Sequence, residues 1–315
     1  QKQGVEYDGG AELRIAEALA YVTTSQGGGG VRRSRLEPGR CTLEQQAVWD
    51  VHGEGIRVVL NEQSGEGLEL EYVIQKYAQR PFLLMRLSVS NISKRAIQLH
   101  ELVLIEANKG KLLLGNQNSG LDFFKVGWHG WDYSGLRHTN QGEPGTLISR
   151  LARRQYSNPT TPILSQRGEF YSEGWAMLES EREAVLIGLV SMADQFGQVR
   201  ACCRPGALSL RLVTQADGIL LSPGERFDSE WGYLQFVTLP DPDPAGEYTC
   251  AVARQMGART GHQPAPQWTH WYHFYQDISA QKFIANLEMI DANRSRVPFQ
   301  MVQLDDGYQS AWGEW

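Results

Sequence analysis

The sequence predicts a chain of two parts, a large antiparallel β-sandwich followed by the first strands of an α/β barrel that is truncated at Trp315. Three observations predict this fold class. Short stretches of alternating apolar and polar residues, separated by turn-forming clusters, recur until about residue 260. The last few dozen residues instead combine two short apolar stretches with one helical pattern. At 315 residues, the chain also exceeds the usual size of one domain.

Alternation with a period of two identifies the sandwich strands. It is clearest where Leu68, Leu70, Tyr72 and Ile74 alternate with mostly polar neighbours, the pattern of a half-buried strand. Further strands are expected at residues 83–89, 184–190 and 208–212, with turn clusters at 64–67, 91–93 and 222–224. Many short strands at this spacing are typical of a large antiparallel sandwich.

The domain boundary is expected after residue 245. Residues 1–245 would form the N-terminal β-sandwich domain, and residues 246–315 would form a linker helix and the incomplete start of a barrel. The connection runs from the proline-rich stretch 241–246, through a bridging helix, to Pro264-Ala-Pro266.

The final segment reads as a strand, a helix and a second strand. The first strand is expected around Trp268–Tyr275 and the second, buried on both faces, around Phe299–Leu304. Between them Ser279 occupies an N-cap position, and apolar residues follow at helical spacing: Phe283, Ile284, Leu287 and Ile290. Such a βαβ unit presents ligand-binding groups at the carboxyl ends of its strands.

Two adjacent carboxylates, Asp305 and Asp306, stand at the end of the second expected strand. Both can face one ligand only if the backbone leaves the strand there, and Gly307 permits that turn. Two carboxylates this close need donors or cations to stay ionised, and sugar hydroxyls are good donors. The alternative is a capped turn in which each aspartate accepts hydrogen bonds from local backbone N–H groups.

Aromatic residues give a second indication of a sugar site. Trp128 and Trp131 fall in a loop rich in glycine and polar residues, where an indole ring can stack on the apolar face of a sugar. The alternative is that both rings pack beneath the loop as a small satellite cluster. His270 and His273 have no cysteine or carboxylate nearby to complete a site, so no metal and no other cofactor is expected.

The segments Trp271-Tyr-His-Phe-Tyr275 and Gln303-Leu-Asp-Asp-Gly-Tyr-Gln309, with Trp312-Gly-Glu-Trp315, closely resemble the N-terminal part of glycoside hydrolase family 36. This family contains bacterial and fungal α-galactosidases, or melibiases, and relatives among plant raffinose-metabolising enzymes. Upstream, Lys125-Val-Gly-Trp128-His-Gly-Trp131 resembles the family's tryptophan loop, and Leu221–Glu225 with Ser229–Tyr233 resembles its last sandwich strands. The resemblance covers most of the chain and implies that the barrel is of the TIM type.

The resemblance implies retaining hydrolysis of terminal α-D-galactosyl residues from oligosaccharides such as melibiose and raffinose. Asp305 and Asp306 would accept hydrogen bonds from the galactose 4- and 6-hydroxyls, Tyr272 would line the pocket, and Trp128 or Trp131 would close it. In the family the nucleophile and the acid/base lie on later barrel strands, and neither is in this sequence. A barrel needs about 250 residues, so the chain is expected to be a fragment without hydrolase activity.

Two other classes of function stay open. One is a non-catalytic carbohydrate-binding sandwich, which would need a complete site within the sandwich. The other is galactosyl transfer of the raffinose-synthase type, which depends on how water is excluded from the acceptor site. Specificity for N-acetylgalactosamine in place of galactose also stays open.

The composition of the chain limits the kinds of molecule that it is expected to bind. The net charge is −6, with basic residues dispersed, so neither nucleic acid nor a membrane surface is an expected partner. Four cysteines without metal or disulfide spacing favour a reducing compartment, so a cytoplasmic location is expected, and secretion stays open as the alternative. A galactosyl oligosaccharide is the expected substrate, and a homo-oligomer is expected by analogy with the family.

Overall fold

A computed structural model describes residues 14–15, 17–26, 29–64, 67–115, 121–129, 132–143, 162, 164, 166–261, 263–311 and 313–314. The chain divides into two compact units, Gln1–Ala258 and Arg259–Trp315. The first unit is mainly antiparallel sheet, and the second combines helices with a parallel pair of strands. No helix in the described ranges is both long enough and apolar enough to cross a bilayer.

The larger layer of the first unit is a ten-stranded sheet, counted over the described residues. Its strand order is β11-β10-β13-β14-β18-β7-β6-β5-β4, and β17 also pairs with β7. The strands are β4 (Thr42–Asp50), β5 (Gly53–Ser64), β6 (Leu68–Tyr77), β7 (Phe82–Asn91), β10 (Asp122–Lys125), β11 (Gly135–Arg137), β13 (Trp175–Glu179), β14 (Glu183–Leu189), β17 (Arg226–Asp228) and β18 (Gly232–Thr238).

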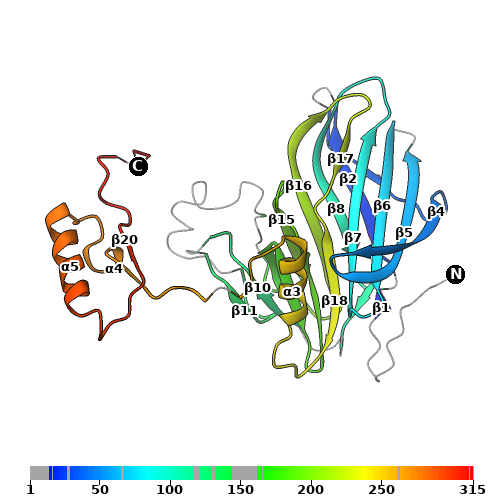
Figure 1. Cartoon of the computed structure of the whole chain (residues 1–315). Coiled ribbons are helices and arrows are strands. Elements are labelled where there is room, and N and C mark those ends of the chain that lie inside the picture. Colours follow the sequence, from blue (N-terminus) through cyan, green and yellow to red (C-terminus); the bar gives the residue numbers. More distant parts are fainter. Residues whose placement is uncertain are drawn as a thin grey trace. The chain divides into compact units, whose positions relative to one another are not determined.

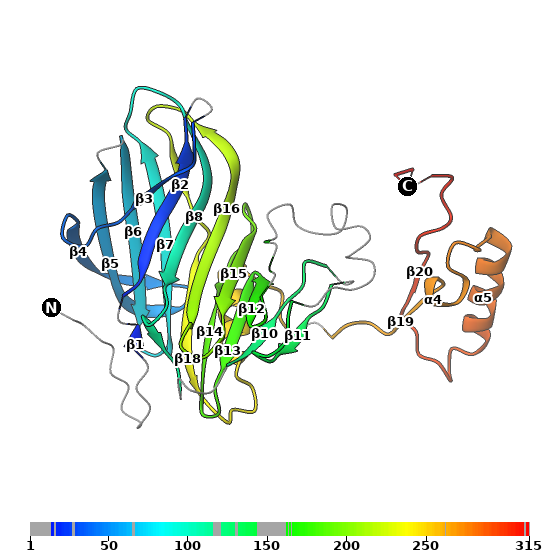
Figure 2. The same cartoon turned by 180° about the vertical axis from the view of Figure 1, so that it is seen from behind.

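The smaller layer is a six-stranded sheet of order β12-β15-β16-β8-β2-β3, again over the described residues (Figure 2). Its strands are β2 (Leu19–Ser25), β3 (Arg32–Arg35), β8 (Ile97–Ala107), β12 (Glu169–Glu173), β15 (Gly197–Cys202) and β16 (Ser209–Leu221). A short pair, β1 (Arg14–Ile15) and β9 (Leu112–Leu113), lies outside both sheets.

The core lies between the two layers. On β7, Met85, Leu87 and Val89 are at most 3% exposed and contact residues of the six-stranded sheet such as Leu104 and Leu99. Because side chains alternate along a strand, Phe82 and Leu84 belong to a different cluster on the opposite face. The antiparallel sandwich predicted from the period-two pattern is therefore confirmed.

Helix α3 (Gly246–Gln255) covers part of the outer face of the ten-stranded sheet (Figure 1). Its Tyr248 and Ala251 are buried among side chains of β7, β14 and β18, and the Tyr248 hydroxyl donates to the Leu189 carbonyl at 2.7 Å. The expected boundary after residue 245 assigned this helix to the second part. The compact unit instead ends at Ala258, because two residues of the helix complete a core cluster of the sandwich.

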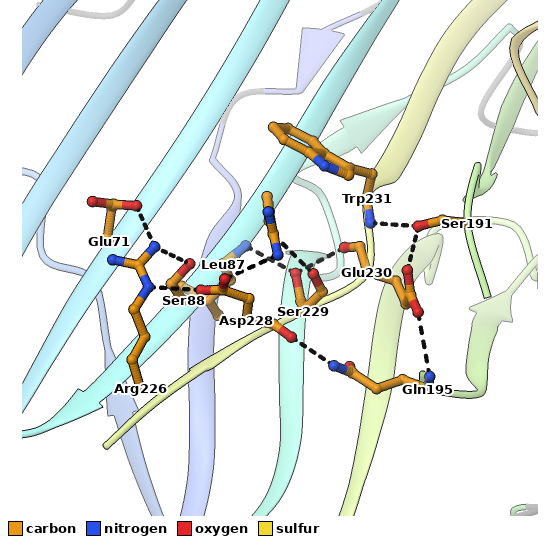
Figure 3. Close-up of polar contacts among 11 residues, drawn as sticks. Glu71, Leu87, Ser88, Ser191, Gln195, Arg226, Asp228, Ser229, Glu230 and Trp231 are labelled. Atoms are coloured by element: carbon orange, nitrogen blue, oxygen red, sulfur yellow. Dashed lines mark hydrogen bonds and ion pairs between the residues drawn. The ribbon is translucent and has the colours of Figure 1, made fainter. Parts of the chain in front are cut away.

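The junction between β17 and β18 carries the Ser229–Tyr233 motif and is held by a network of hydrogen bonds (Figure 3). The buried Glu230 carboxylate accepts hydrogen bonds from the Ser191 hydroxyl and from the backbone N–H groups of Asp194, at 2.7 Å, and Gln195, at 3.3 Å. Because these donors satisfy the buried carboxylate, Glu230 has a structural role: it links the β17–β18 junction to residues 191–195. It is therefore not a candidate catalytic group.

The second unit contains β19 (Gln267–Thr269), α4 (Trp271–Phe274), α5 (Ala280–Ala292) and β20 (Met301–Gln303). Strands β19 and β20 are parallel neighbours, so the predicted βαβ unit is present. The Ser279 hydroxyl accepts from the Lys282 backbone N–H at 3.3 Å, which confirms the predicted N-cap of α5. A single parallel pair does not define a barrel, and the barrel stays a prediction.

Two details of the second unit differ from expectation. The first strand ends at Thr269, and the residues from Trp271 to Phe274 form the short helix α4 instead of continuing that strand. The second strand is not buried on both faces, since Met301 is 50% and Leu304 is 42% exposed. Among the described residues β20 pairs with β19 alone, so its second edge has no neighbouring strand.

Candidate functional site

The candidate site is the turn that follows β20, beside the carboxyl end of β19. Thr269, the last residue of β19, pairs with Gln303, the last residue of β20. Both strands therefore end at the same level, and His270, directly after β19, lies next to Asp305, two residues after β20. The parallel pairing sets this arrangement, because carboxyl ends of parallel strands share one edge.

Asp305 is held by three side-chain contacts of its carboxylate and one of its backbone. Its Oδ2 accepts from the Thr269 hydroxyl at 3.1 Å and from Gln303 Nε2 at 3.2 Å. Its Oδ1 accepts from the Asp306 backbone N–H at 2.8 Å. Donors from both strands thus fix the orientation of this carboxylate before any ligand binds.

His270 ties the turn to the end of β19. Its ring is 0% exposed, and it is the only buried residue among those described after Ala258. Nδ1 accepts from the Asp305 backbone N–H at 3.0 Å, so the proton is on Nε2, which donates to the Asp306 carbonyl at 3.0 Å. This tautomer positions the backbone on both sides of the aspartate pair.

Asp306 keeps a free acceptor. Its Oδ1 accepts from the Gly307 backbone N–H at 2.9 Å and from the side-chain amide of Gln309. Its Oδ2 has no hydrogen-bond donor among the residues that the structure describes. Both aspartates thus make the local backbone contacts of a capped turn, and Asp306 in addition offers an oxygen to a donor from outside.

Gly307 has the backbone conformation that the turn requires. Its φ is +103°, and a Cβ atom there would lie 2.6 Å from the Gln276 Cα. Any other residue would be strained by its φ and would also clash with the backbone after α4. The turn predicted at Gly307 is therefore present, and its close approach to Gln276 holds it against the first half of the unit.

Within the described part of the second unit, Tyr272 makes no hydrogen bond to either aspartate. Tyr272 lies on α4 and is 81% exposed. Trp128 belongs to the first unit, where its ring meets the Phe196 ring edge-on at 4.6 Å between centroids. Trp131 lies outside the described residues. The structure thus brings together Asp305 and Asp306, while the proposed roles of the three aromatic residues stay predictions.

The loop that carries Trp128 is anchored at its start by a buried cation. Lys125, the last residue of β10, is 2% exposed, forms an ion pair with Glu143, and lies 4.0 Å from the centre of the Tyr171 ring. Burial raises the pKa of the Glu143 carboxyl, although the Lys125 charge opposes this shift. The Trp128 backbone N–H donates to Asp132 Oδ2 at 3.1 Å, so the loop turns back on itself just after the anchor.

Sequence reasoning missed His270 as a positioning residue. The histidine was considered only as a metal ligand, and no cluster of three or more metal-ligating side chains occurs among the described residues. The sequence placed His270 inside the first expected strand, Trp268–Tyr275, whereas the structure ends that strand at Thr269 and puts His270 directly after it. A polar residue at that point has backbone groups of the neighbouring turn within reach.

No family model matches the sequence. Among solved structures, the chain is similar in fold to the α-galactosidase from Lactobacillus brevis, with 14% identity, a TM-score of 0.52, and coverage of 94% of this chain and 36% of that one. It is also similar to a variant of a GH36 α-galactosidase from Geobacillus stearothermophilus in complex with 1-deoxygalactonojirimycin, with 12% identity, a TM-score of 0.52, and coverage of 99% and 41%.

A third similar structure is the galactosidase domain of an α-galactosidase-sucrose kinase, with 10% identity, a TM-score of 0.51, and coverage of 94% of this chain and 37% of that one. At these identities the likeness concerns the fold. The chain spans about two fifths or less of the length of these three proteins. Its fold is thus similar to that of the N-terminal region of GH36 α-galactosidases.

Proposed function

We propose that this chain is the substrate-recognising front part of a glycoside hydrolase that removes terminal α-galactosyl residues with retention of configuration. The observation that carries the proposal is the aspartate pair at the ends of two parallel strands, with Asp306 Oδ2 free to accept. The fold similarity to α-galactosidases supports the choice of sugar.

In the proposed site, Asp305 and Asp306 accept hydrogen bonds from the 4- and 6-hydroxyls of galactose. Hydrogen bonds to a charged acceptor are stronger than neutral ones, and a site that lacks its expected hydroxyl leaves a desolvated carboxylate unpaired. The pair would therefore favour the axial 4-hydroxyl of galactose over the equatorial one of glucose. Tyr272, Trp128 and Trp131 are the proposed apolar walls of the same pocket.

The proposal assigns no nucleophile and no acid/base to residues 1–315. Retaining hydrolysis uses two carboxyl groups about 5–5.5 Å apart on either side of the scissile bond. One of them attacks the anomeric carbon, and the other protonates the leaving oxygen and then activates water. Asp305 and Asp306 both use oxygens to hold one turn together, which suits them to binding hydroxyls and not to changing protonation in each cycle.

Isothermal calorimetry of the chain with galactose and with glucose tests the proposal. We expect saturable binding of galactose that Asp306→Asn weakens roughly tenfold to a hundredfold, since one charge-assisted hydrogen bond is lost. Asp291→Asn is the matched control, because Asp291 is an exposed aspartate on α5. Equal binding of both sugars, or an Asp306→Asn variant that binds as well as the control, would overturn the proposal.

An activity assay separates recognition from catalysis. We expect no release of the aryl group from an aryl α-galactoside by the chain, because neither catalytic carboxylate is assigned to it. Turnover above the rate of a no-protein blank would show that the nucleophile lies within residues 1–315. The roles given to Asp305 and Asp306 would then be wrong.

A further inference from the structure

Trp128 is held in two ways, by hydrogen bonds of its backbone and by a contact of its ring. The Gly127 backbone N–H donates to the Ser134 hydroxyl at 2.9 Å, and the Trp128 backbone N–H donates to Asp132 Oδ2 at 3.1 Å. These bonds fix the backbone of the loop but leave the side-chain torsions of the indole open. The ring contact is with Phe196, at 72° between the ring planes and 4.6 Å between centroids.

Phe196 lies at the end of residues 190–196, which join β14 to β15 and which we call the β14–β15 loop. Its side chain is 52% exposed, but its backbone is fixed. The Phe196 carbonyl accepts from the Gln215 backbone N–H at 2.9 Å. At the next residue, Gly197, a Cβ atom would lie 2.9 Å from the Val213 carbonyl oxygen, so this end of the loop lies tightly against β16.

The rest of the β14–β15 loop is held by the buried Glu230 carboxylate (Figure 3). The Ser191 hydroxyl and the backbone N–H groups of Asp194 and Gln195 all donate to it. The Gln195 side-chain amide donates in addition to the Asp228 carbonyl at 2.6 Å. Bonds to a buried charged acceptor are strong, so the loop is a fixed support for the aromatic ring that it carries.

A fixed support of this kind can select the orientation of a neighbouring ring. Tilted and edge-to-face aromatic pairs are favoured because the positive edge of one ring meets the negative face of the other, which favours one arrangement by roughly twofold to tenfold. Since the backbones of Trp128 and Phe196 are both fixed, their contact selects among the rotamers of the indole. A ring that is already oriented when the sugar arrives does not have to be ordered during binding.

We propose that Phe196 is a positioning residue, which holds the Trp128 indole in the orientation that receives the sugar, and that Glu230 supports it by fixing the β14–β15 loop. This inference rests on the proposed function, which makes Trp128 a wall of the galactose pocket. It assigns to Phe196 a contact with Trp128 and none with the sugar. It also gives a reason for a half-exposed aromatic ring on a loop that is otherwise firmly bonded.

The first test observes the Trp128 ring without any sugar. Fluorotryptophan is incorporated into the whole chain, and the fluorine NMR signal that Trp128→Phe removes is assigned to Trp128. We expect Phe196→Ala to shift and broaden this signal, because the indole then samples several rotamers, and Phe196→Tyr to leave it near its wild-type position. Leu220→Ala is the matched control, since Leu220 is a 63% exposed apolar residue on β16. A Trp128 signal that Phe196→Ala leaves unchanged would overturn the proposal.

The second test measures galactose binding of the same variants by calorimetry. We expect Phe196→Ala to weaken binding by roughly twofold to tenfold, because a smaller fraction of the chain then has the indole in its binding orientation, and Phe196→Tyr to restore it. Phe196→Ala binding as tightly as the Leu220→Ala control would overturn this inference and leave the proposed function standing. If the wild type itself binds no galactose, the proposed function fails and the role in sugar binding fails with it, while the fluorine spectra still decide whether Phe196 positions the ring.

Discussion

Asp305 and Asp306 show how two identical side chains acquire different surroundings one residue apart. Asp305 receives donors from Thr269 and Gln303, at the ends of both strands, and is fully occupied in orienting the turn. The Asp306 carboxylate bonds only to residues that follow it, and one of its oxygens has no donor among the described residues. His270 binds the backbone of both aspartates. The Asp305 carboxylate lies beside Thr269 and Gln303 at the strand ends, whereas the Asp306 carboxylate binds Gly307 and Gln309 in the turn that follows.

Asp228 provides a residue-scale prediction about pH. Burial alone would raise the pKa of its carboxyl, but hydrogen bonds from Ser88 and Arg226 and the charge of Arg86 hold that pKa below its usual value (Figure 3). A lowered pKa contributes stability that is present above the unfolded-state pKa and is lost as pH falls through the folded-state pKa. We expect the melting temperature of Asp228→Asn to be lower at neutral pH and to fall less steeply between about pH 5 and pH 2 than that of the wild type.

Thermal unfolding followed by circular dichroism at several pH values checks this prediction. Asp194→Asn is the control, because Asp194 is exposed and only its backbone N–H takes part in the neighbouring network. Parallel pH curves for the wild type and Asp228→Asn would show that the arginine contacts do not contribute to acid stability.

At the scale of elements, α3 is a part of the sandwich core rather than a linker. Two of its residues are buried against the outer face of the ten-stranded sheet, and the Tyr248 ring lies 5.1 Å from the Tyr233 ring and 5.2 Å from the Trp175 ring. The remaining side chains of the helix are partly or fully exposed. A short helix of this kind is stable because of its packed face and not because of its intrinsic propensity.

We therefore expect Tyr248→Ala to lower the free energy of unfolding by about 3–5 kcal/mol, the range for removing a large buried aromatic side chain. The neighbouring Thr249→Ala should change it by about 0.5 kcal/mol or less, since Thr249 is exposed on the same helix. Urea unfolding followed by fluorescence measures both values. Similar losses for the two variants would mean that the helix is not anchored through Tyr248.

At the scale of the whole molecule, the two units differ in how much of a core they contain. The core clusters of the described residues draw their buried members from the first unit and include none beyond Ala251. In the second unit only His270 is buried among the described residues, while Met289, Tyr272 and other apolar side chains are at least half exposed. Hydrophobic burial can stabilise the first unit by itself, but not the second.

A truncation tests this difference. We expect residues 1–258 alone to unfold cooperatively, with a melting temperature within a few degrees of that of the whole chain, because the core clusters remain complete. Residues 259–315 alone should show no cooperative transition in calorimetry. A large loss of stability in the shorter chain, or a sharp transition in the 259–315 peptide, would contradict this description.

Much of the fold and part of the site could be predicted from local pattern. The alternation at Leu68 and Leu70 identified a sandwich strand, Ser279 identified the start of α5, and Gly307 identified the turn after the aspartate pair. Each of these depends on the residue itself and its near neighbours. The burial of β20 was expected wrongly, because an apolar stretch shows that a strand can be buried but does not supply the layer that covers it.

The sequence by itself determined that a β-sandwich is followed by a βαβ unit and that two carboxylates stand at its second strand end. Period-two alternation, an N-cap and a glycine turn are properties of adjacent residues, and so they can be read along the chain. Only the tertiary structure decided that His270 holds the aspartate turn, that α3 belongs to the sandwich, and that β4 is an open edge. These features depend on which distant segments become neighbours, and strand register and packing determine that, not local pattern.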